Sequence, residues 1–461
     1  MLLKRKHTHS SDAHSELLKP ESKTRIFLKL AWPATIETVL VGLISVIDTV
    51  MVSGVGKGAI AAVGITNQPK LILLSIIFSL NIGVTAIVSR RTGQGDREGA
   101  NKCHRQTLLI CFFTSLAAAV MGYIYSTPIM KLAGASPEYI SAAAEYFKII
   151  MISIVFTSAS LTINAAQRGA GNTKIAMKSN VSGNIVNLIF NYFLINGIWL
   201  FPRLGVKGAA IATVLGSAVA FGMSVWSVLK KDSYISLTEK FTWRFDMKNI
   251  RLLFSISSGA MVEQIFIRIG FFVYTLIVAK LGMIEYEAHQ ICMNIITISY
   301  CFGDGIGVAA STLVGQSLGA KQPQKAVDYG RTGQKIAFFV SSVLFFIFIF
   351  GRNHLALPFT DIKEELVLCS SILIIIAFCT HAQTSAVVLS GCLKGAGDTK
   401  YIAITSLISI GIIRPFITWY LCFYMGYGLI GAWISLLIDH YMRLAFYAAR
   451  FKGGKWLKRE F

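Results

Sequence analysis

The chain has 461 residues, of which 54% are hydrophobic and only 15% are charged, and its mean hydropathy is +0.60. A soluble domain carries about 25% charged residues, so a soluble core of this composition would lack polar surface to cover it. These figures exclude a soluble globular enzyme, a disordered chain and a disulfide scaffold. The eight cysteines form no C-x-x-C pair and are expected to act as small hydrophobic residues. The composition predicts a membrane protein that crosses the bilayer many times.

Apolar runs long enough to cross a bilayer follow one another along the chain. A spanning helix needs about 20 mostly apolar residues, and twelve runs meet that requirement. They lie at 26–53, 60–89, 105–126, 139–167, 173–195, 208–230, 249–281, 285–318, 333–350, 364–392, 399–424 and 428–450. The predicted fold class is all-α integral membrane, with twelve transmembrane helices.

Basic residues gather in alternate connections between these runs. If the N-terminus is cytoplasmic, the inner segments hold 31 of the 44 Lys and Arg residues, and the outer connections hold seven. This positive-inside pattern predicts a plasma-membrane protein with both termini in the cytoplasm. The net charge of +21 is then expected to face anionic lipid headgroups, and nucleic acid is not an expected partner.

The second half of the chain repeats the first at an offset of 226 residues. The segment RGAGNTK at 168–174 recurs as KGAGDTK at 394–400, and residues 33–56 align with 259–282. Each GAG segment is expected to form a tight turn between helices rather than a phosphate loop. Because each unit holds six helices, an even number, the units are predicted to be parallel six-helix bundles related by a pseudo-twofold axis.

The repeat predicts a division of the chain into lobes. The expected parts are a polar cytoplasmic N-terminus at 1–25, an N-lobe at 26–230, a cytoplasmic linker at 231–248, a C-lobe at 249–450 and a basic cytoplasmic tail at 451–461. Transporters place their substrate at the interface of such repeats, so transport by alternating access is the predicted activity.

Two acidic residues lie inside the first predicted helix. Glu37 and Asp48 are eleven residues apart, about three turns, and so project from nearly one face. An ionisable side chain at the bilayer centre costs about 2.5–3.5 kcal/mol on insertion scales, which marks it as a candidate for function. A buried carboxylate lowers that cost by taking a proton or binding a cation. Asp48 is therefore predicted to couple transport to an ion, with sodium as one candidate; the alternative is that it reaches the outer interface and is solvated.

Neutral oxygen ligands for such an ion are present on two later helices. Asn187 and Asn191 are one turn apart in the run 173–195, and Thr213 lies in the run 208–230. These three residues are predicted to form the ion-coupling site with Asp48. The alternative is ordinary hydrogen bonding between helices, which polar residues also provide in membranes.

The second half repeats only one of the two acidic residues of the first helix. Glu263 is the repeat partner of Glu37, whereas Tyr274 stands where Asp48 would recur. Ion-responsive chemistry is thus predicted in the N-lobe, and Glu37 and Glu263 are predicted to line the substrate cavity and attract cations. The structural alternative for Glu263 is a pair with Arg268, although five residues along a helix place the two on different faces.

Three further polar or helix-breaking residues lie within the predicted spans. Asp439 is expected to form an ion pair with Arg443 one turn later, and Asp304, between two glycines, has no predicted role. Pro33 removes a backbone hydrogen bond from the first helix and is predicted to act as a hinge, with a static kink as the alternative.

These segments resemble the multidrug and toxic compound extrusion (MATE) family. The resemblance rests on Pro33 and VIDTVMVSGVG in the first helix, TGQG after the second, and the duplicated GAG-TK segments, and it covers about residues 24–450. It implies a cation-coupled antiporter of twelve helices in two bundles, which exports organic cations and other xenobiotics. In that family the aspartate matching Asp48 is central to proton or sodium coupling, and the asparagine matching Asn187 belongs to the same polar site.

Two departures from the family pattern leave the choice between sodium and proton open. Archaeal-type members carry a second aspartate where this chain has Asn191. Another subgroup has an acidic residue in the tenth helix, where this chain has only His381 and Gln383, whose role is not predicted.

Three alternatives to a drug antiporter were weighed on the sequence. A lipid-linked oligosaccharide flippase of the same superfamily would also be duplicated but would have a more basic cavity, and a non-transporting scaffold is the second alternative. An enzyme is not expected, because no metal-ligand or nucleophile–base spacing is present. The chain is predicted to act as a monomer without a cofactor other than its coupling ion.

Overall fold

The computed structural model describes residues 22–53, 59–198, 201–230, 233–238 and 246–459. All regular structure within these ranges is helical. The predicted all-α fold class is therefore confirmed. The predicted N-terminal segment 1–25 and linker 231–248 lie largely outside the described residues.

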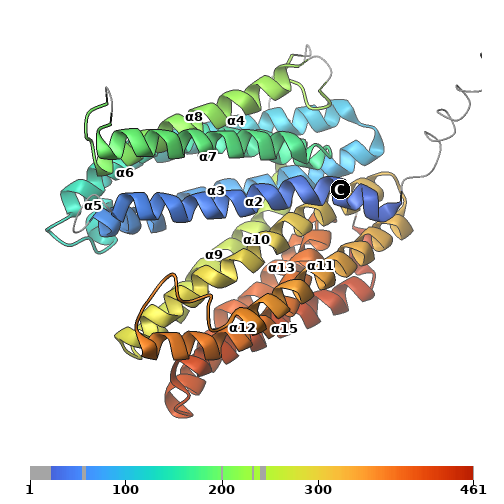
Figure 1. The fold of residues 1–461 in the computed structure, drawn as a ribbon. Coiled ribbons are helices and arrows are strands. Elements are labelled where there is room, and N and C mark those ends of the chain that lie inside the picture. Colours follow the sequence, from blue (N-terminus) through green and yellow to red (C-terminus); the bar gives the residue numbers. More distant parts are fainter. Residues whose placement is uncertain (1–21, 54–58, 199–200, 231–232, 239–245, 460–461) are drawn as a thin grey trace, which may run out of the picture.

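Six long helices and one short helix form the first bundle, here called the N-lobe (Figure 1). They are α2 (Lys23–Ser53), α3 (Ala59–Gln94), α4 (Arg97–Ile124), the short α5 (Ser126–Leu132), α6 (Ile140–Gly169), α7 (Thr173–Asn196) and α8 (Val206–Leu229).

The second bundle, the C-lobe, repeats this order with one helix broken into segments. Its members are α9 (Met247–Ala279), α10 (Met283–Gly319), α11 (Pro323–Gly351), α12 (Lys363–Gly395), the composite helix α13 (Thr399–Ser406), η1 (Leu407–Ile413), α14 (Arg414–Trp419) and η2 (Tyr420–Tyr424), then α15 (Gly428–Lys452) and the short η3 (Lys455–Lys458). The segments η1 and η2 are π-helical.

Eleven helices in the described part of the chain are long and apolar enough to cross a membrane. The twelfth long helix, α7, has 24 residues but a more polar surface. Its polar character comes from four asparagines at helical spacing: Asn180, Asn184, Asn187 and Asn191. A helix of this length that carries four amides in an otherwise apolar bundle is expected to turn them toward protein rather than lipid.

Two helices begin earlier than their apolar runs predict. The predicted run 105–126 belongs to α4, which begins at Arg97, and the run 333–350 belongs to α11, which begins at Pro323. An apolar run marks only the part of a helix that hydrocarbon covers, and the helix continues beyond it wherever its first turn is satisfied. Asp96 supplies that satisfaction for α4, because its side chain accepts a hydrogen bond from the amide of Gly99 at 2.8 Å.

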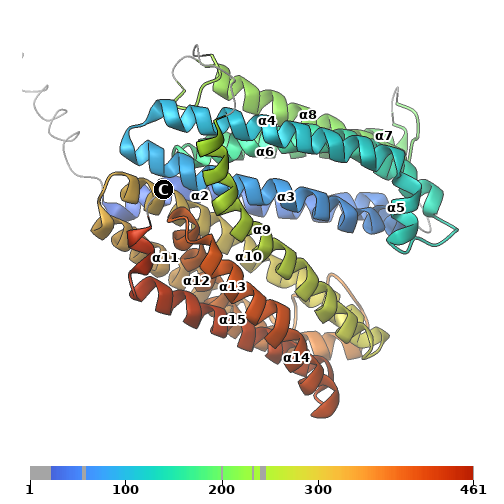
Figure 2. The same ribbon diagram turned by 180° about the vertical axis from the view of Figure 1, so that it is seen from behind.

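The packing of the helices repeats with the sequence. In the N-lobe α2 packs on α7 and α3 on α6, and in the C-lobe the equivalent helices α9 and α10 pack on α13 and α12. Between the lobes α2 packs on α10 and α3 packs on α9, two contacts that exchange under the repeat. Figures 1 and 2 show the two bundles close together near the C-terminus and diverging toward the other end.

The lobes meet at the end of the molecule that carries the GAG turns and the C-terminal tail, here called the basic end. Glycines bring α3 and α10 into backbone contact there, since a Cβ on Gly93 would lie 1.9 Å from the carbonyl oxygen of Gln316. The side chain of Gln316 also donates to the carbonyl of Gly169 at 3.0 Å, and Thr312 donates to that of Arg168 at 3.1 Å. The C-lobe thus holds the GAG turn of the N-lobe.

Candidate functional site

A cavity of about 450 Å³ lies within the N-lobe. Residues of α2, α3, α6, α7 and α8 line it, among them Val41, Asp48, Lys70, Tyr146, Asn187 and Thr213. Its volume is within the range of pockets that hold drug-sized ligands. The lining is unusually polar for a space between spanning helices, because α7 turns its asparagines into it.

Asp48 is the acidic residue of this cavity, and two amides of α7 hold its carboxylate. Asn191 donates from Nδ2 to Oδ1 of Asp48 at 2.8 Å. Asn187 donates to Oδ2 at 2.9 Å and accepts from the backbone amide of Thr213 at 3.1 Å, in the amide orientation that avoids setting two acceptors against each other. The structure therefore brings together all four residues predicted as the ion-coupling site, although the geometry alone does not test their role.

The donor set of this site fits a small cation. Asn191 is almost fully buried, and its Oδ1 has no hydrogen-bond partner among the described residues. A carboxylate, an unpartnered amide oxygen and the hydroxyl of Thr213 are the oxygen ligands that a hard cation prefers. The same carboxylate can instead take a proton.

Parallel packing of α2 on α7 explains how the sequence builds the site. Glu37 contacts Asn180, and Asp48 contacts Asn191, so both pairs are separated by 143 residues. The two helices run in the same direction and keep one register over eleven residues, about 16 Å. The prediction that Glu37 and Asp48 share one face of their helix is confirmed, and that face is covered by α7.

Lys70 is a cavity residue that the sequence analysis missed. It lies on α3 directly after Pro69, and it lines the same cavity as Asp48, whose charge acts on it. Lysine in a spanning segment costs about as much as aspartate, and this cost was the signal that could have found it. Tyr146, which also lines the cavity from α6, carries no comparable sequence signal.

The prediction that Glu37 lines the substrate cavity is wrong. Its side chain is buried, and one carboxylate oxygen accepts hydrogen bonds from both Arg168 and Asn180. The residues that line the N-lobe cavity do not include it. A carboxylate that is already neutralised by arginine offers little attraction to a cationic substrate.

Glu263 has the equivalent arrangement in the C-lobe. Its carboxylate forms an ion pair with Lys394 at 3.0 Å and is 6% exposed. Both pairs, Glu37 with Arg168 and Glu263 with Lys394, are separated by 131 residues. The basic residue that opens each GAG segment is thus the counter-ion of the glutamate, so the predicted role of Glu263 in attracting cations is corrected in the same way. Arg268 is not its partner.

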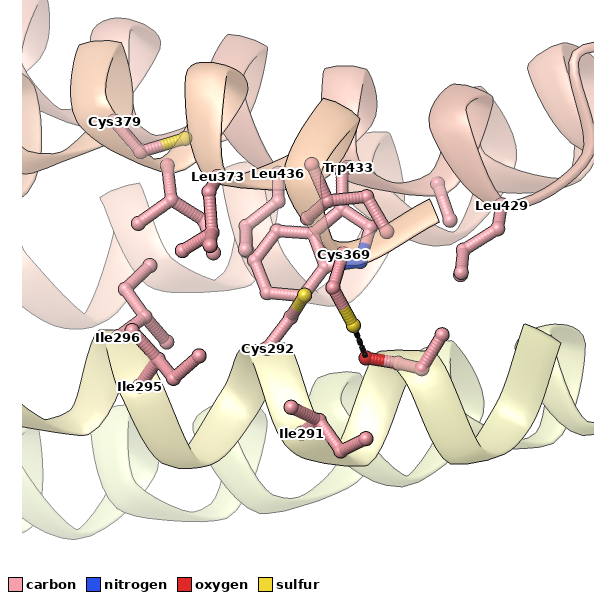
Figure 3. Packing of buried hydrophobic residues seen from close by; sticks show 14 of the residues in the cluster. Ile291, Cys292, Ile295, Ile296, Cys369, Leu373, Cys379, Leu429, Trp433 and Leu436 are labelled. Atoms are coloured by element: carbon pink, nitrogen blue, oxygen red, sulfur yellow. Dashed lines mark hydrogen bonds between the residues drawn. The ribbon is translucent and has the colours of Figure 1, made fainter. Parts of the chain in front are cut away.

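The C-lobe counterpart of the cavity is filled. The repeat places Tyr274 at the position of Asp48 and Leu436 at that of Thr213, and both belong to a buried hydrophobic cluster. Tyr274 packs against the ring of His289, which packs against Trp433 at a centroid distance of 5.6 Å. Figure 3 shows Trp433 of α15 closely surrounded by cysteine and aliphatic side chains of α10 and α12. The two lobes share a backbone plan but only one retains the space.

The remaining acidic residues of the C-lobe differ in their surroundings. Asp439 forms the expected ion pair with Arg443 at 3.0 Å, and it also binds Arg414 and Ser409 of the composite helix. Asp304 is exposed on α10, within electrostatic reach of the Glu263 pair.

Neither His381 nor Pro33 is placed in the cavity by the structure. The ring of His381 packs against Phe338 and Phe345, and its Nε2 lies 3.2 Å from the hydroxyl of Ser342. Pro33 lies inside α2, whose helical structure continues on both sides of it. The predicted hinge at Pro33 therefore stays a prediction.

Comparison with known proteins gives consistent matches over nearly the whole chain. A family model described as MatE matches residues 33–193 and again residues 260–420. The probable multidrug resistance protein NorM of Thermotoga maritima is 26% identical and covers 95% of this chain and 94% of its own length. For the multidrug resistance protein PmpM of Pseudomonas aeruginosa the identity is 25%, with 85% of this chain and 82% of that protein covered. Among solved structures, an outward-facing multidrug resistance transporter superposes with a TM-score of 0.87 at 19% identity, over 95% of this chain and 98% of that one.

Proposed function

Because the chain belongs to the MatE family of multidrug efflux transporters, we propose that it exports small organic cations from the cytoplasm in exchange for a proton or a sodium ion. It is a multi-pass membrane transporter rather than an enzyme. Both lobes belong to one chain, so the proposed working unit is a monomer that opens its N-lobe cavity alternately to the two sides of the membrane.

The observation that carries the proposal is the position of Asp48, held by Asn187 and Asn191 inside the N-lobe cavity. An ionised carboxylate accepts hydrogen bonds from both amides, whereas a protonated one has to donate from one of its oxygens. Taking a proton therefore forces α2 and α7 to change their contact. Binding a sodium ion would instead draw the amide oxygens toward the carboxylate.

Exchange follows from competition for one negative charge. A cationic substrate is attracted while Asp48 is ionised, and a proton or sodium ion that neutralises Asp48 removes that attraction. The coupling ion and the substrate then occupy the cavity in turn, which is the condition for antiport. No further source of energy is needed in this scheme.

The proposed orientation places the basic end in the cytoplasm of a cell whose plasma membrane the chain spans. The positive-inside pattern supports it, since the GAG turns and the C-terminal tail carry Arg168, Lys394, Lys455 and Lys458 at that end. The divergence of the two bundles away from the basic end (Figure 1) then corresponds to a state that faces the outside.

The test is export of a cationic dye from membrane vesicles under separately imposed sodium and pH gradients. Asp48→Asn keeps the shape of the side chain but cannot change its charge, so it is expected to abolish gradient-driven export. Asn187→Ala is expected to reduce export less, because water can replace one neutral ligand. The gradient that drives the wild-type protein identifies the coupling ion.

Two controls make the result decisive. Expression in the membrane and a monodisperse elution profile in detergent show that Asp48→Asn still folds. Wild-type export rates in Asp48→Asn under the same gradients would contradict the proposed role of Asp48, and failure of the wild-type protein to export the dye under either gradient would contradict the proposed function.

A further inference from the structure

The N-lobe cavity contains a positive charge as well as a negative one. Among the described residues that line it, Asp48 and Lys70 are the charged ones, and all others are neutral. An ammonium group beside the site proposed to attract cations is unexpected, because it repels the same substrates. The proposed function gives Lys70 no task.

The surroundings of Lys70 leave its ammonium group incomplete. Both oxygens of Asp48 accept from amides of α7, so Asp48 does not depend on Lys70 for hydrogen bonds. Within the part of the chain that the structure describes, Lys70 has Asp48 as its electrostatic partner and forms no ion pair or hydrogen bond of its own. A lysine ammonium carries three donors, and in a cavity between spanning helices these donors face the space that a ligand would fill.

The arginines of the same lobe show the contrast. Arg168 neutralises Glu37 directly, and the arginines of the C-lobe core, Arg414 and Arg443, both bind Asp439. These cations have partners within the protein and serve packing. Lys70 has a cavity in front of it instead.

We propose that Lys70 is an anion-binding residue of the N-lobe cavity, so that the preferred substrates carry a carboxylate as well as a cationic group. This inference rests on the proposed function and names its substrate class. The cationic group of such a zwitterion lies toward Asp48 and its carboxylate accepts hydrogen bonds from the Lys70 ammonium. With both charges matched, the cavity binds the substrate without leaving either of its own charges unpaired.

The same geometry explains why the coupling ion displaces such a substrate. When Asp48 is neutralised, the cavity holds one net positive charge from Lys70 and no longer matches a zwitterion. The cationic part of the substrate loses its partner, while its carboxylate alone remains bound. Release is therefore driven by the loss of one of two contacts.

The test uses two dyes that differ only in this feature: rhodamine 6G, whose carboxyl group is an ethyl ester, and rhodamine 19, the corresponding free acid. Binding to the purified full-length protein is measured by fluorescence anisotropy, and uptake into proteoliposomes is measured in parallel. In Lys70→Met the affinity for the free acid is expected to fall about tenfold or more, the size expected for losing one charge-assisted hydrogen bond. The affinity for the ester is expected to stay the same or rise, and Lys70→Arg should retain the preference for the acid.

The matched control is Lys280→Met, which removes an exposed lysine beyond the end of α9 and should leave both affinities unchanged. An equal loss for both dyes in Lys70→Met, or no loss for either, would overturn the proposal. If Lys70→Met does not fold, Asp48→Asn answers the same question, because it leaves Lys70 alone in the cavity and should raise the ratio of acid to ester affinity. An unchanged or lower ratio there also overturns the inference. Wild-type uptake of neither dye would instead count against the proposed function.

Discussion

Glu37 and Asp48 lie on the same face of one helix, yet their neighbours give them different chemistry. Glu37 is paired with a guanidinium at the basic end, and Asp48 has only neutral amides within hydrogen-bond distance. An ion pair fixes the charge of a carboxylate, whereas amide donors leave it free to change. The residue type alone therefore does not identify a coupling site; the counter-charge does.

The pairing of Glu37 with Arg168 predicts a loss of stability when it is broken. Removing one partner of a buried ion pair typically costs about 3–5 kcal/mol, and the partial exposure of Arg168 reduces that to about 1–2 kcal/mol. Arg168→Met should therefore lower the apparent Tm of the protein in detergent, and the same is expected for Lys394→Met in the equivalent pair.

A surface pair provides the comparison. Lys207 and Glu145 are 2.9 Å apart, but both side chains are about half exposed, so Lys207→Met should change the apparent Tm very little. The double variant Glu37→Gln with Arg168→Met should recover part of the loss, because no unpaired charge remains buried. Equal Tm values for Arg168→Met and Lys207→Met would show that the buried pair does not stabilise the lobe.

At the scale of helices, length and hydropathy were enough to predict the elements but not all of the site. The helix α7 was predicted at 173–195 and lies at Thr173–Asn196, because a continuous apolar run marks a span regardless of its partners. Asp48 stood out for a local reason, its charge within such a run. Lys70 has the same local signal, yet one lysine changes the hydropathy of a run of thirty residues too little to attract attention.

Other features needed packing that no local pattern contains. Both members of the Glu37–Arg168 pair recur at the offset of 226 residues, so the repeat held that signal, but Arg168 was assigned to a turn. Whether the space between five helices stays open or is filled depends on side chains from all of them. The sequence alone therefore predicted where the N-lobe site lies but not that its C-lobe counterpart is a closed core.

The contact of α3 with α10 gives a prediction for the movement between the lobes. A side chain at Gly93 would meet the backbone of Gln316, which cannot move aside as the end of a flexible side chain can. Gly93→Leu should prevent the basic end from closing as it does here and lower export about tenfold or more, the effect of an overpacking cost of about 1–3 kcal/mol. The measurement is the initial rate of dye export in vesicles with matched protein content.

Gly222 is the matched control for this change. It is also a glycine within a spanning helix, but a Cβ there would meet nothing within 4 Å. Gly222→Leu should export at close to the wild-type rate. If Gly93→Leu did the same, the close backbone contact at the basic end would not be part of the transport cycle.

At the scale of the whole molecule, the chain keeps the symmetry of its backbone while the interiors of its halves differ. Contacts between the lobes exchange under the repeat, α2 on α10 for α3 on α9, so the halves are placed to rock against each other as equals. The N-lobe carries the cavity with its two charges. The C-lobe, filled by Tyr274, His289 and Trp433, provides a firm body against which the N-lobe moves.

The filled core of the C-lobe also sets the stoichiometry of the transporter. Two equivalent cavities in one duplicated chain could influence each other's occupancy, and binding would then deviate from a simple hyperbola. With Tyr274 and Leu436 in place of Asp48 and Thr213, the duplicated half has no room for a second ligand of the same kind. Isothermal titration of the purified protein with a transported dye should accordingly give one mole of dye per mole of chain and a Hill coefficient of about one.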